Sequence, residues 1–287
     1  MNNFERASVL SEALPYIRAF SKKTVVIKYD NRAAMQSEEL KRAAISDIVL
    51  LSLVGIRVVV VHNGGFEVDL ALKAMGKEAK FIDGLRYTDK ETMDVVQMVL
   101  AGKIGKSIVS LINSEGGKAL GFSGLDGSLI TAEKLKGDVD YGFVGEIKSI
   151  NPELINVALD NGYIPVISTI AEGVDANTSY NLNADTAAAE LAVSLDAKKL
   201  ILLTNTYGIC SDENDESTLI SEIPLSNVRP LIKKGIISGE MIHKVDCCVK
   251  AVRRGVERTH ILDGRKQHSI LVEMLTDSGI GTMILAD

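Results

Sequence analysis

The feature that most constrains the fold is a run of β-branched residues that ends in a lysine and a turn. Residues 24–27 are threonine, valine, valine and isoleucine, and Lys28, Tyr29, Asp30 and Asn31 follow. Such a run is typical of a buried central strand of a parallel sheet. Open α/β sheets bind ligands at the carboxyl ends of their strands, where Lys28 would meet an anionic substrate. Lys28 can equally be a lysine that reaches solvent from an ordinary strand end, and the two interpretations are evenly balanced on this stretch alone.

A second strand of the same kind is expected at residues 56–62, and its loop contains Asn63, Gly64 and Gly65. Further along the chain, predicted strands alternate with helices, which indicates parallel βαβ units. We place a domain boundary near residue 178. It separates 1–178 from 179–287, on one continuous sheet or on two abutting sheets.

Composition and charge exclude several classes of protein. The 287 residues are 46% apolar and 24% charged, as in an ordinary folded protein, and the net charge of -6 argues against nucleic-acid binding. The most apolar stretch, 48–61, is interrupted and shorter than the ~20 residues of a membrane span, and the N-terminus does not resemble a signal peptide. We therefore expect no membrane contact. The three cysteines, Cys210, Cys247 and Cys248, do not form a disulfide framework, so we expect a reducing, cytoplasmic location.

An amphipathic helix is predicted over residues 3–20, ahead of the first strand. Its apolar residues recur every three or four positions, so one face must pack against something. The helix can fold back on its own domain or contact a neighbouring subunit.

The segment 180–190 carries two asparagines and an aspartate into an alanine-rich helix. Asn183 fits an ordinary helix N-cap. Asp185 and Asn181 can also form a polar wall of an active site, with Asp185 orienting lysines and Asn181 binding a carboxylate. On this segment alone, capping is the better explanation.

Two further segments can contact a nucleotide. Residues 237–245 form a turn and the start of a helix, where backbone amides attract anions and Lys244 can reach a phosphate. An exposed lysine at a helix start is the more common situation. Residues 202–209 run from a strand into a turn and can hold a ribose and base.

Taken together, these segments resemble the amino acid kinase family, and within it the N-acetylglutamate kinases of arginine biosynthesis. The resemblance covers nearly the whole chain. Its most specific motifs, in order, are 84–89 (GLRYTD), 124–127 (GLDG), 144–147 (VGEI), 180–185 (YNLNAD), 260–265 (HILDGR) and 279–284 (GIGTMI).

The resemblance implies an α/β fold, a three-layer α/β/α sandwich with a mainly parallel central sheet. It also implies transfer of phosphate from ATP, accompanied by Mg2+, to the γ-carboxylate of N-acetyl-L-glutamate. Residues 1–178 would bind acetylglutamate and residues 179–287 would bind ATP. By this analogy the catalytic residues are Lys28, Lys244 and Asp185; the substrate-binding residues are Gly64, Gly65, Arg86 and Asn181; and the nucleotide-binding residues are Thr204, Gly208, Gly239 and Met241.

The N-terminal helix resembles that of arginine-inhibited hexameric members, in which such helices interlace between dimers. A homodimer or a hexamer built as a trimer of dimers is therefore expected. Tyr16 and His268 stand where the family places parts of its arginine site. Ser278 replaces an expected acidic residue, which leaves arginine inhibition in doubt.

The departures from the family pattern fall where the phosphate would bind. The family has glycines at four positions that here hold Asp30, Asn31, Asn63 and Glu240. It has a proline at the position of Phe66, an aspartate at that of Asn205, and a small residue or proline at that of Tyr207. Glycine lets the backbone approach a ligand closely, and a carboxylate there adds repulsion.

Three hypotheses follow from these departures. The chain is a working acetylglutamate kinase, a catalytically weak or inactive ligand-binding relative, or another family member that acts on aspartate, glutamate or carbamate. The retained lysines, arginine and Asp185 favour the first hypothesis, and the altered loops favour the second. The motifs at 84–89 and 180–185 argue against the third.

Overall fold

The structure is a computed structural model that describes residues 2–30, 37–82, 84–213, 215–277 and 279–287. The strands of its main sheet are β1 (Thr24–Tyr29), β2 (Arg57–His62), β5 (Ala119–Gly124), β6 (Ile130–Lys134), β7 (Gly145–Ile150), β8 (Ile164–Gly173), β9 (Ser179–Asn181), β10 (Lys199–Thr204), β11 (Glu222–Pro224), β12 (Arg258–Asp263) and β13 (Thr282–Leu285). A separate hairpin contains β3 (Phe81–Ile82) and β4 (Leu85–Arg86).

The α-helices are α1 (Asn3–Phe20), α3 (Glu38–Leu53), α4 (Gly65–Ala74), α5 (Lys90–Gln97), α6 (Gly105–Ser114), α7 (Glu153–Asp160), α8 (Ala184–Ser194), α9 (Leu225–Lys233), α10 (Glu240–Arg253) and α11 (Ser269–Leu275). A π-helical segment, η1 (Met98–Ile104), joins α5 to α6, and two short 3-10 turns are η2 (Asp126–Ser128) and η3 (Glu216–Thr218).

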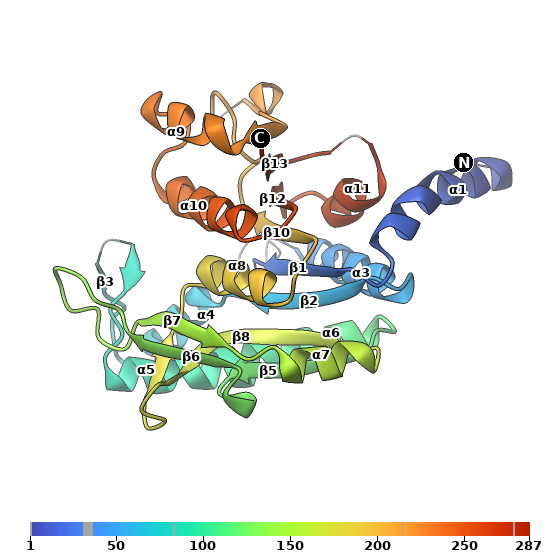
Figure 1. The fold of residues 1–287 in the computed structure, drawn as a ribbon. Helices are drawn as coiled ribbons and strands as arrows, with labels where there is room; N and C mark the ends of the chain where they lie inside the picture. Colours follow the sequence, from blue (N-terminus) through green and yellow to red (C-terminus); the bar gives the residue numbers. More distant parts are fainter. Residues whose placement is uncertain (1, 31–36, 83, 214, 278) are drawn as a thin grey trace.

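One sheet runs through the whole molecule. Its strand order is β11-β13-β12-β10-β1-β2-β8-β6-β7, and β5 and β9 both pair with β8. The pairs from β12 through β10, β1 and β2 to β8 are parallel, and helices cover both faces (Figure 1). The predicted three-layer α/β/α sandwich with a mainly parallel sheet is confirmed. The domain boundary near residue 178 stays a prediction. Strands β1 and β10, which come from the two sides of this boundary in the sequence, pair directly within the one sheet.

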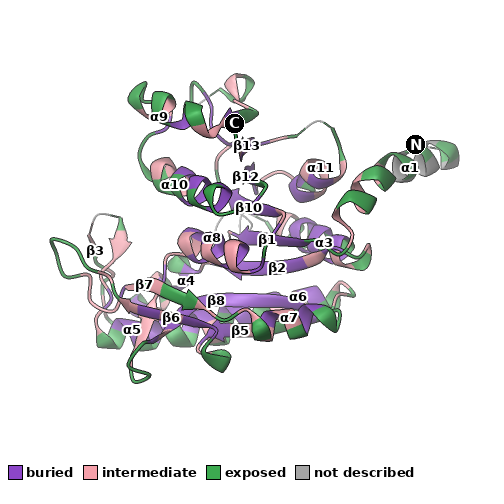
Figure 2. Ribbon diagram, in the orientation of Figure 1, coloured by how far each residue is buried: buried purple, intermediate pink, exposed green. Residues whose placement is uncertain are grey.

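The alternation of side chains along β1 decides where Lys28 points. Val25, Ile27 and Tyr29 belong to the hydrophobic cluster under α3, α4 and α6, whereas Val26 belongs to the cluster on the opposite face, under α8 and α10. Both clusters are fully buried along the central strands (Figure 2). Because side chains two apart share a face, Lys28 lies on the same side as Val26, toward α8 and α10.

The long helix that spans Lys90–Ser114 is a second apolar stretch besides 48–61. This helix is the one in the described part of the chain that is long and apolar enough to cross a membrane by length and composition. Its middle and C-terminal parts pack on β5 and β8, as a core helix does. The π-helical segment η1 lies in the middle of this helix and ends just before Gly105.

Candidate active site

Two lysines from distant parts of the chain contact one carboxylate. Lys28, near the carboxyl end of β1, has its Nζ 3.2 Å from Oδ1 of Asp185, in the first turn of α8. Lys244, in α10, donates to Oδ2 of the same aspartate at 2.7 Å. The side chains of Lys28 and Asp185 are only 3% and 7% exposed, so both charges are held away from water. Asp185 therefore positions two ammonium groups at the same small volume.

The protonation of this cluster follows from its charges. Burial by itself opposes the charge on Lys28, but the carboxylates of Asp185 and Asp30 outweigh burial and raise the pKa of Lys28 above its ordinary value. Burial likewise opposes the charge on Asp185, yet Lys28 and Lys244 hold the pKa of this carboxyl far below its usual range. Lys28 and Asp185 are therefore both ionised at neutral pH.

The cap of α8 explains why Asp185 lies where it does. Asn183 is the N-cap of this helix, and its Oδ1 accepts hydrogen bonds from the backbone N–H groups of Asp185 at 2.9 Å and Thr186 at 3.1 Å. The predicted capping role of Asn183 is confirmed. The cap fixes the first turn of the helix, where a negative charge is favoured by the helix dipole.

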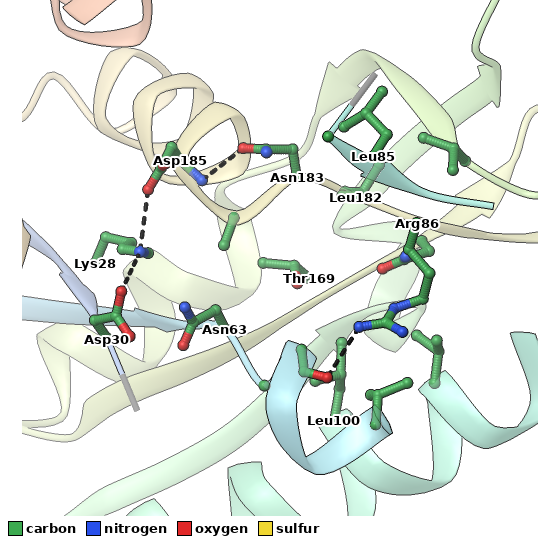
Figure 3. Close-up of a pocket in the computed structure, with 18 of the residues that line it drawn as sticks. Lys28, Asp30, Asn63, Leu85, Arg86, Leu100, Thr169, Leu182, Asn183 and Asp185 are labelled. Atoms are coloured by element: carbon green, nitrogen blue, oxygen red, sulfur yellow. Dashed lines mark hydrogen bonds and ion pairs between the residues drawn. The ribbon is translucent and has the colours of Figure 1, made fainter. Parts of the chain in front are cut away.

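A cavity of about 360 Å³ opens in front of these charges (Figure 3). Lys28 and Asp185 lie on one side of it, and Arg86 projects from the other side. Lys244, which contacts Asp185, also lines the cavity. Its remaining wall includes Gly64, Gly65, Asn181 and several apolar side chains, among them Val68, Val96, Leu100 and Leu182. Cations at two ends and apolar groups between them suit a small anionic molecule that carries an apolar group.

Arg86 and Asn181 are brought together through a shared threonine. Asn181 Nδ2 donates to Thr88 Oγ1 at 3.4 Å, and Thr88 Oγ1 donates to the carbonyl oxygen of Arg86 at 2.9 Å. Arg86 also donates to the carbonyl oxygen of Gly65 at 2.9 Å and to the carboxylate of Asp69. Sequence reasoning overlooked Asp69, because the pattern around it is that of an ordinary amphipathic helix.

Gly64 is needed because the backbone passes close to the long helix. A Cβ at this position would overlap Cδ1 of Ile104 and lie 2.6 Å from Cδ2 of Leu100. The next residue, Gly65, is the first residue of α4, so its backbone N–H is free of helical partners and available to a ligand.

A second cavity, of about 370 Å³, adjoins the first and shares Asn205, Glu240 and Lys244 with it. Three of the residues predicted to bind a nucleotide, Gly208, Gly239 and Met241, line this cavity together with Tyr207 and Arg265. Gly239 precedes α10 with φ at 55° and ψ at -136°, a conformation that favours glycine. Thr204 lies at the same strand end, but its hydroxyl group donates to the carbonyl oxygen of Leu262 at 3.2 Å.

Three residues that we expect to stand in place of family glycines line the cavities: Asp30 and Asn63 line the first, and Glu240 lines both. Asp30 accepts a hydrogen bond from Lys28 Nζ at 3.2 Å, Asn63 follows β2 at the cavity wall, and Glu240 begins α10 between the two cavities. The predicted departures at Asn31 and Ser278 lie outside the described residues.

The two residues predicted for an arginine site contact different carboxylates. Tyr16, in α1, donates its hydroxyl hydrogen bond to Asp277, and His268 Nδ1 lies 2.6 Å from Oδ1 of Asp47, a buried aspartate of α3. His268 directly precedes α11, which contacts α1.

A buried charged cluster near these two residues was missed from the sequence. His260 Nδ1 lies 2.8 Å from Oε1 of Glu273, and Lys199 Nζ lies 4.8 Å from the ring centre of Phe20. Burial lowers the pKa of Lys199 to about 8, although Glu273 opposes this shift. Two sequence features could have indicated this cluster: Lys199 is the first residue of a strand, and His260 is the first residue of the HILDGR motif.

The sequence matches the amino acid kinase family over residues 23–263, and the chain belongs to this family. It is similar over its length to curated acetylglutamate kinases. One from Clostridium kluyveri is 54% identical over 284 residues, which are 99% of this chain and 100% of that protein. One from Thermoanaerobacter pseudethanolicus is 53% identical over 279 residues, 97% of this chain and 93% of that protein.

Solved structures agree on the fold. An N-acetylglutamate synthase from Neisseria gonorrhoeae, complexed with coenzyme A and N-acetyl-glutamate, has a TM-score of 0.86 and 27% identity; the match covers 98% of this chain and 63% of that longer chain. The same synthase complexed with coenzyme A and L-arginine has a TM-score of 0.82 and 26% identity, with 98% and 65% covered. A carbamate kinase from Giardia lamblia bound to AMP-PNP shares the fold, with a TM-score of 0.65, 20% identity, and 92% and 99% covered.

Proposed function

We propose that this protein is an acetylglutamate kinase, which transfers the γ-phosphoryl group of ATP to the γ-carboxylate of N-acetyl-L-glutamate. The single observation that carries the proposal is the convergence of Lys28 and Lys244 on Asp185 at the wall of the cavity. Relatives that are 50–54% identical over nearly the full length and named acetylglutamate kinases support it.

The chemistry requires what this cluster offers. An oxygen of the acceptor carboxylate attacks the γ-phosphorus while the bond from that phosphorus to the oxygen of ADP breaks. Both reactants are anionic, so the protein must supply positive charge at the reacting atoms. Lys28 and Lys244 supply it, Asp185 positions them, and the backbone amides at Gly64 and Gly65 stabilise the acceptor and the phosphoryl oxygens.

The two cavities suit the two substrates. We propose that Arg86 and Asn181 bind the α-carboxylate of N-acetylglutamate and that the cavity lined by Gly208, Gly239 and Met241 holds ATP. No cluster of three or more histidine, cysteine, aspartate or glutamate residues in the described ranges can hold a metal ion. Magnesium would arrive with the nucleotide phosphates, as is usual in kinases.

Trapping of the product tests the proposal directly. The purified protein is incubated with ATP, Mg2+ and N-acetyl-L-glutamate in the presence of hydroxylamine, which converts an acyl phosphate to a hydroxamate. We expect hydroxamate and ADP in equal amounts, and a loss of at least about 100-fold in Lys28→Met, because one charge in a buried site is worth several kcal/mol. ADP release without hydroxamate, or equal rates in both proteins, would refute the assignment.

The ion pair between Lys28 and Asp30 favours a second candidate, a catalytically weak or inactive ligand-binding relative. Asp30 neutralises a cation that phosphoryl transfer needs, and Glu240 adds a carboxylate between the cavities. A variant with glycine at positions 30, 31, 63 and 240 separates the candidates. A large gain in turnover supports impairment, whereas equal turnover excludes it.

The third candidate, a kinase of free amino acids or carbamate, is tested with a substrate panel. Preferred turnover of aspartate, glutamate or carbamate over N-acetylglutamate would replace our assignment. The apolar wall formed by Val68, Val96 and Leu100 supports an acceptor that carries an acetyl group.

We further propose that arginine acts as an effector near α1 and α11, where Tyr16 and His268 lie. The buried carboxylate of Glu273 lies close by, in α11, and is suited to a guanidinium group. Inhibition by arginine that is lost in Glu273→Gln would support this site. We also propose assembly into a homodimer or a hexamer through α1, and a cytoplasmic location, which the three buried free cysteines suit.

A further inference from the structure

Arg86 does not belong to a strand of the main sheet. It lies in β4, which pairs with β3 in a hairpin of two residues per strand, separate from the eleven-stranded sheet. Such a hairpin is a weak anchor by itself. The side chain of Arg86 is nevertheless only 8% exposed, so its guanidinium must find partners in the protein.

Those partners come from one face of α4. Nη1 of Arg86 donates to the carboxylate of Asp69, and Nη2 donates to the carbonyl oxygen of Gly65 at 2.9 Å. Asp69 and Gly65 are four residues apart, so they lie on the same side of the helix. The ring of Phe81 packs against the guanidinium, with Cζ 4.8 Å from the ring centre.

Asp69 acts on the cavity through Arg86. Arg86 and Gly65 are among the cavity-lining residues and Asp69 is not. A guanidinium group has five N–H donors, and the contacts with Asp69 and Gly65 leave three for a ligand. Asp69 is 38% exposed, so water screens its repulsion of an incoming anion while its oxygen still holds Nη1.

We propose that Asp69 is a positioning residue for substrate recognition. By holding the guanidinium of Arg86 at the cavity wall, it sets the preference for an acceptor that carries a second carboxylate beside its acetamido group. The identity of this acceptor rests on the proposed function.

The test compares two acceptors in three variants. N-acetyl-L-glutamate carries the α-carboxylate, and N-acetyl-γ-aminobutyrate lacks it. The variants are Asp69→Ala, Asp69→Asn and, as a matched control, Asp160→Ala. Asp160 forms a similar pair with Arg57, whose Nη2 also donates to Asn156 at 3.2 Å, far from the cavity. Dissociation constants from calorimetry are measured beside kcat and KM.

Asp69→Ala should raise Kd and KM for N-acetylglutamate roughly 10-fold, the value of one charge-assisted hydrogen bond, and leave kcat and KM for ATP within about 2-fold. N-acetyl-γ-aminobutyrate should be unaffected. Asp69→Asn retains an acceptor oxygen for Nη1 and should restore the affinity to within about 3-fold of the unaltered protein, since the position of Arg86 is kept. Asp160→Ala should match the unaltered protein.

Three results would overturn the proposal: equal weakening for both acceptors, no weakening in Asp69→Ala, or tighter binding in Asp69→Asn, which would mean that Asp69 competes with the ligand. The binding measurement needs no turnover. A protein that binds N-acetylglutamate but forms no acyl phosphate would therefore refute the proposed function while still testing Asp69. If the unaltered protein binds neither acceptor, both proposals fall.

Discussion

Replacing Asp30 with asparagine should make the protein a better kinase. Asp30 lies 3.2 Å from Lys28 Nζ, so at an effective dielectric constant near 20 the attraction between the two charges is about 5 kcal/mol. A phosphoryl oxygen that binds the same ammonium would lie roughly 5 Å from the Asp30 carboxylate, which gives about 3 kcal/mol of repulsion. The side chain of Asp30 is 14% exposed, and water reduces this value.

We therefore expect Asp30→Asn to raise kcat/KM for ATP by roughly 10- to 200-fold, since each 1.4 kcal/mol is a factor of ten. The rate of ADP release is measured at saturating N-acetylglutamate while ATP is varied. Asp94→Asn is the matched control, because Asp94 pairs with Lys90 at 3.8 Å on the surface of α5. An unchanged or lower kcat/KM in a correctly folded Asp30→Asn protein would refute the electrostatic reasoning and show that Asp30 leaves Lys28 when ATP binds.

Three further predictions concern stability and assembly. Burial lowers the pKa of His62 to about 4, so between pH 4 and 6.5 the unfolded chain binds more protons than the folded one and stability rises with pH. His62 should thus lower the free energy of unfolding by about 3 kcal/mol as the pH falls from 6.5 to 4. In urea unfolding, the His62→Gln variant should lack this part of the pH dependence. Gly64→Ala should cost about 1–3 kcal/mol by overpacking, whereas Gly102→Ala, where a Cβ meets open space, should not destabilise; thermal unfolding compares them. Deleting residues 1–20, whose helix leaves Phe4 88% exposed, should reduce the sedimentation coefficient to that of a smaller assembly, and an unchanged oligomer would contradict the proposed role of α1.

The central strands were predictable because burial on both faces demands unbroken apolar residues. The β-branched run that begins at residue 24 forms β1, Thr24–Tyr29, and the strand expected to end near residue 204 is β10, Lys199–Thr204. Other elements gave weaker signals. α11 follows His268, which adopts a left-handed conformation with φ at 58° where a glycine or asparagine would have marked the turn, and β11 has only three residues.

Only those residues of the candidate site that belong to recognisable sequence motifs could be predicted. Lys28, Asp185 and Lys244 belong to recognisable segments, and the parallel sheet brings them to one edge. Contacts such as Arg86 with Asp69, or His260 with Glu273, depend on how a helix docks on a hairpin or a strand. No periodicity in the sequence reports that geometry, so these partners emerge only from the structure.

The long helix at Lys90–Ser114 has a consequence for how the chain must be made. Its apolar side is sheltered by β5 and β8, and β8 is completed only when residue 173 has been synthesised. Until then a ribosome-bound nascent chain presents this apolar helix without the strand β8 that covers part of it. Fragments that stop before residue 164 should therefore be captured by chaperones or aggregate, whereas fragments that extend past β8 can bury it.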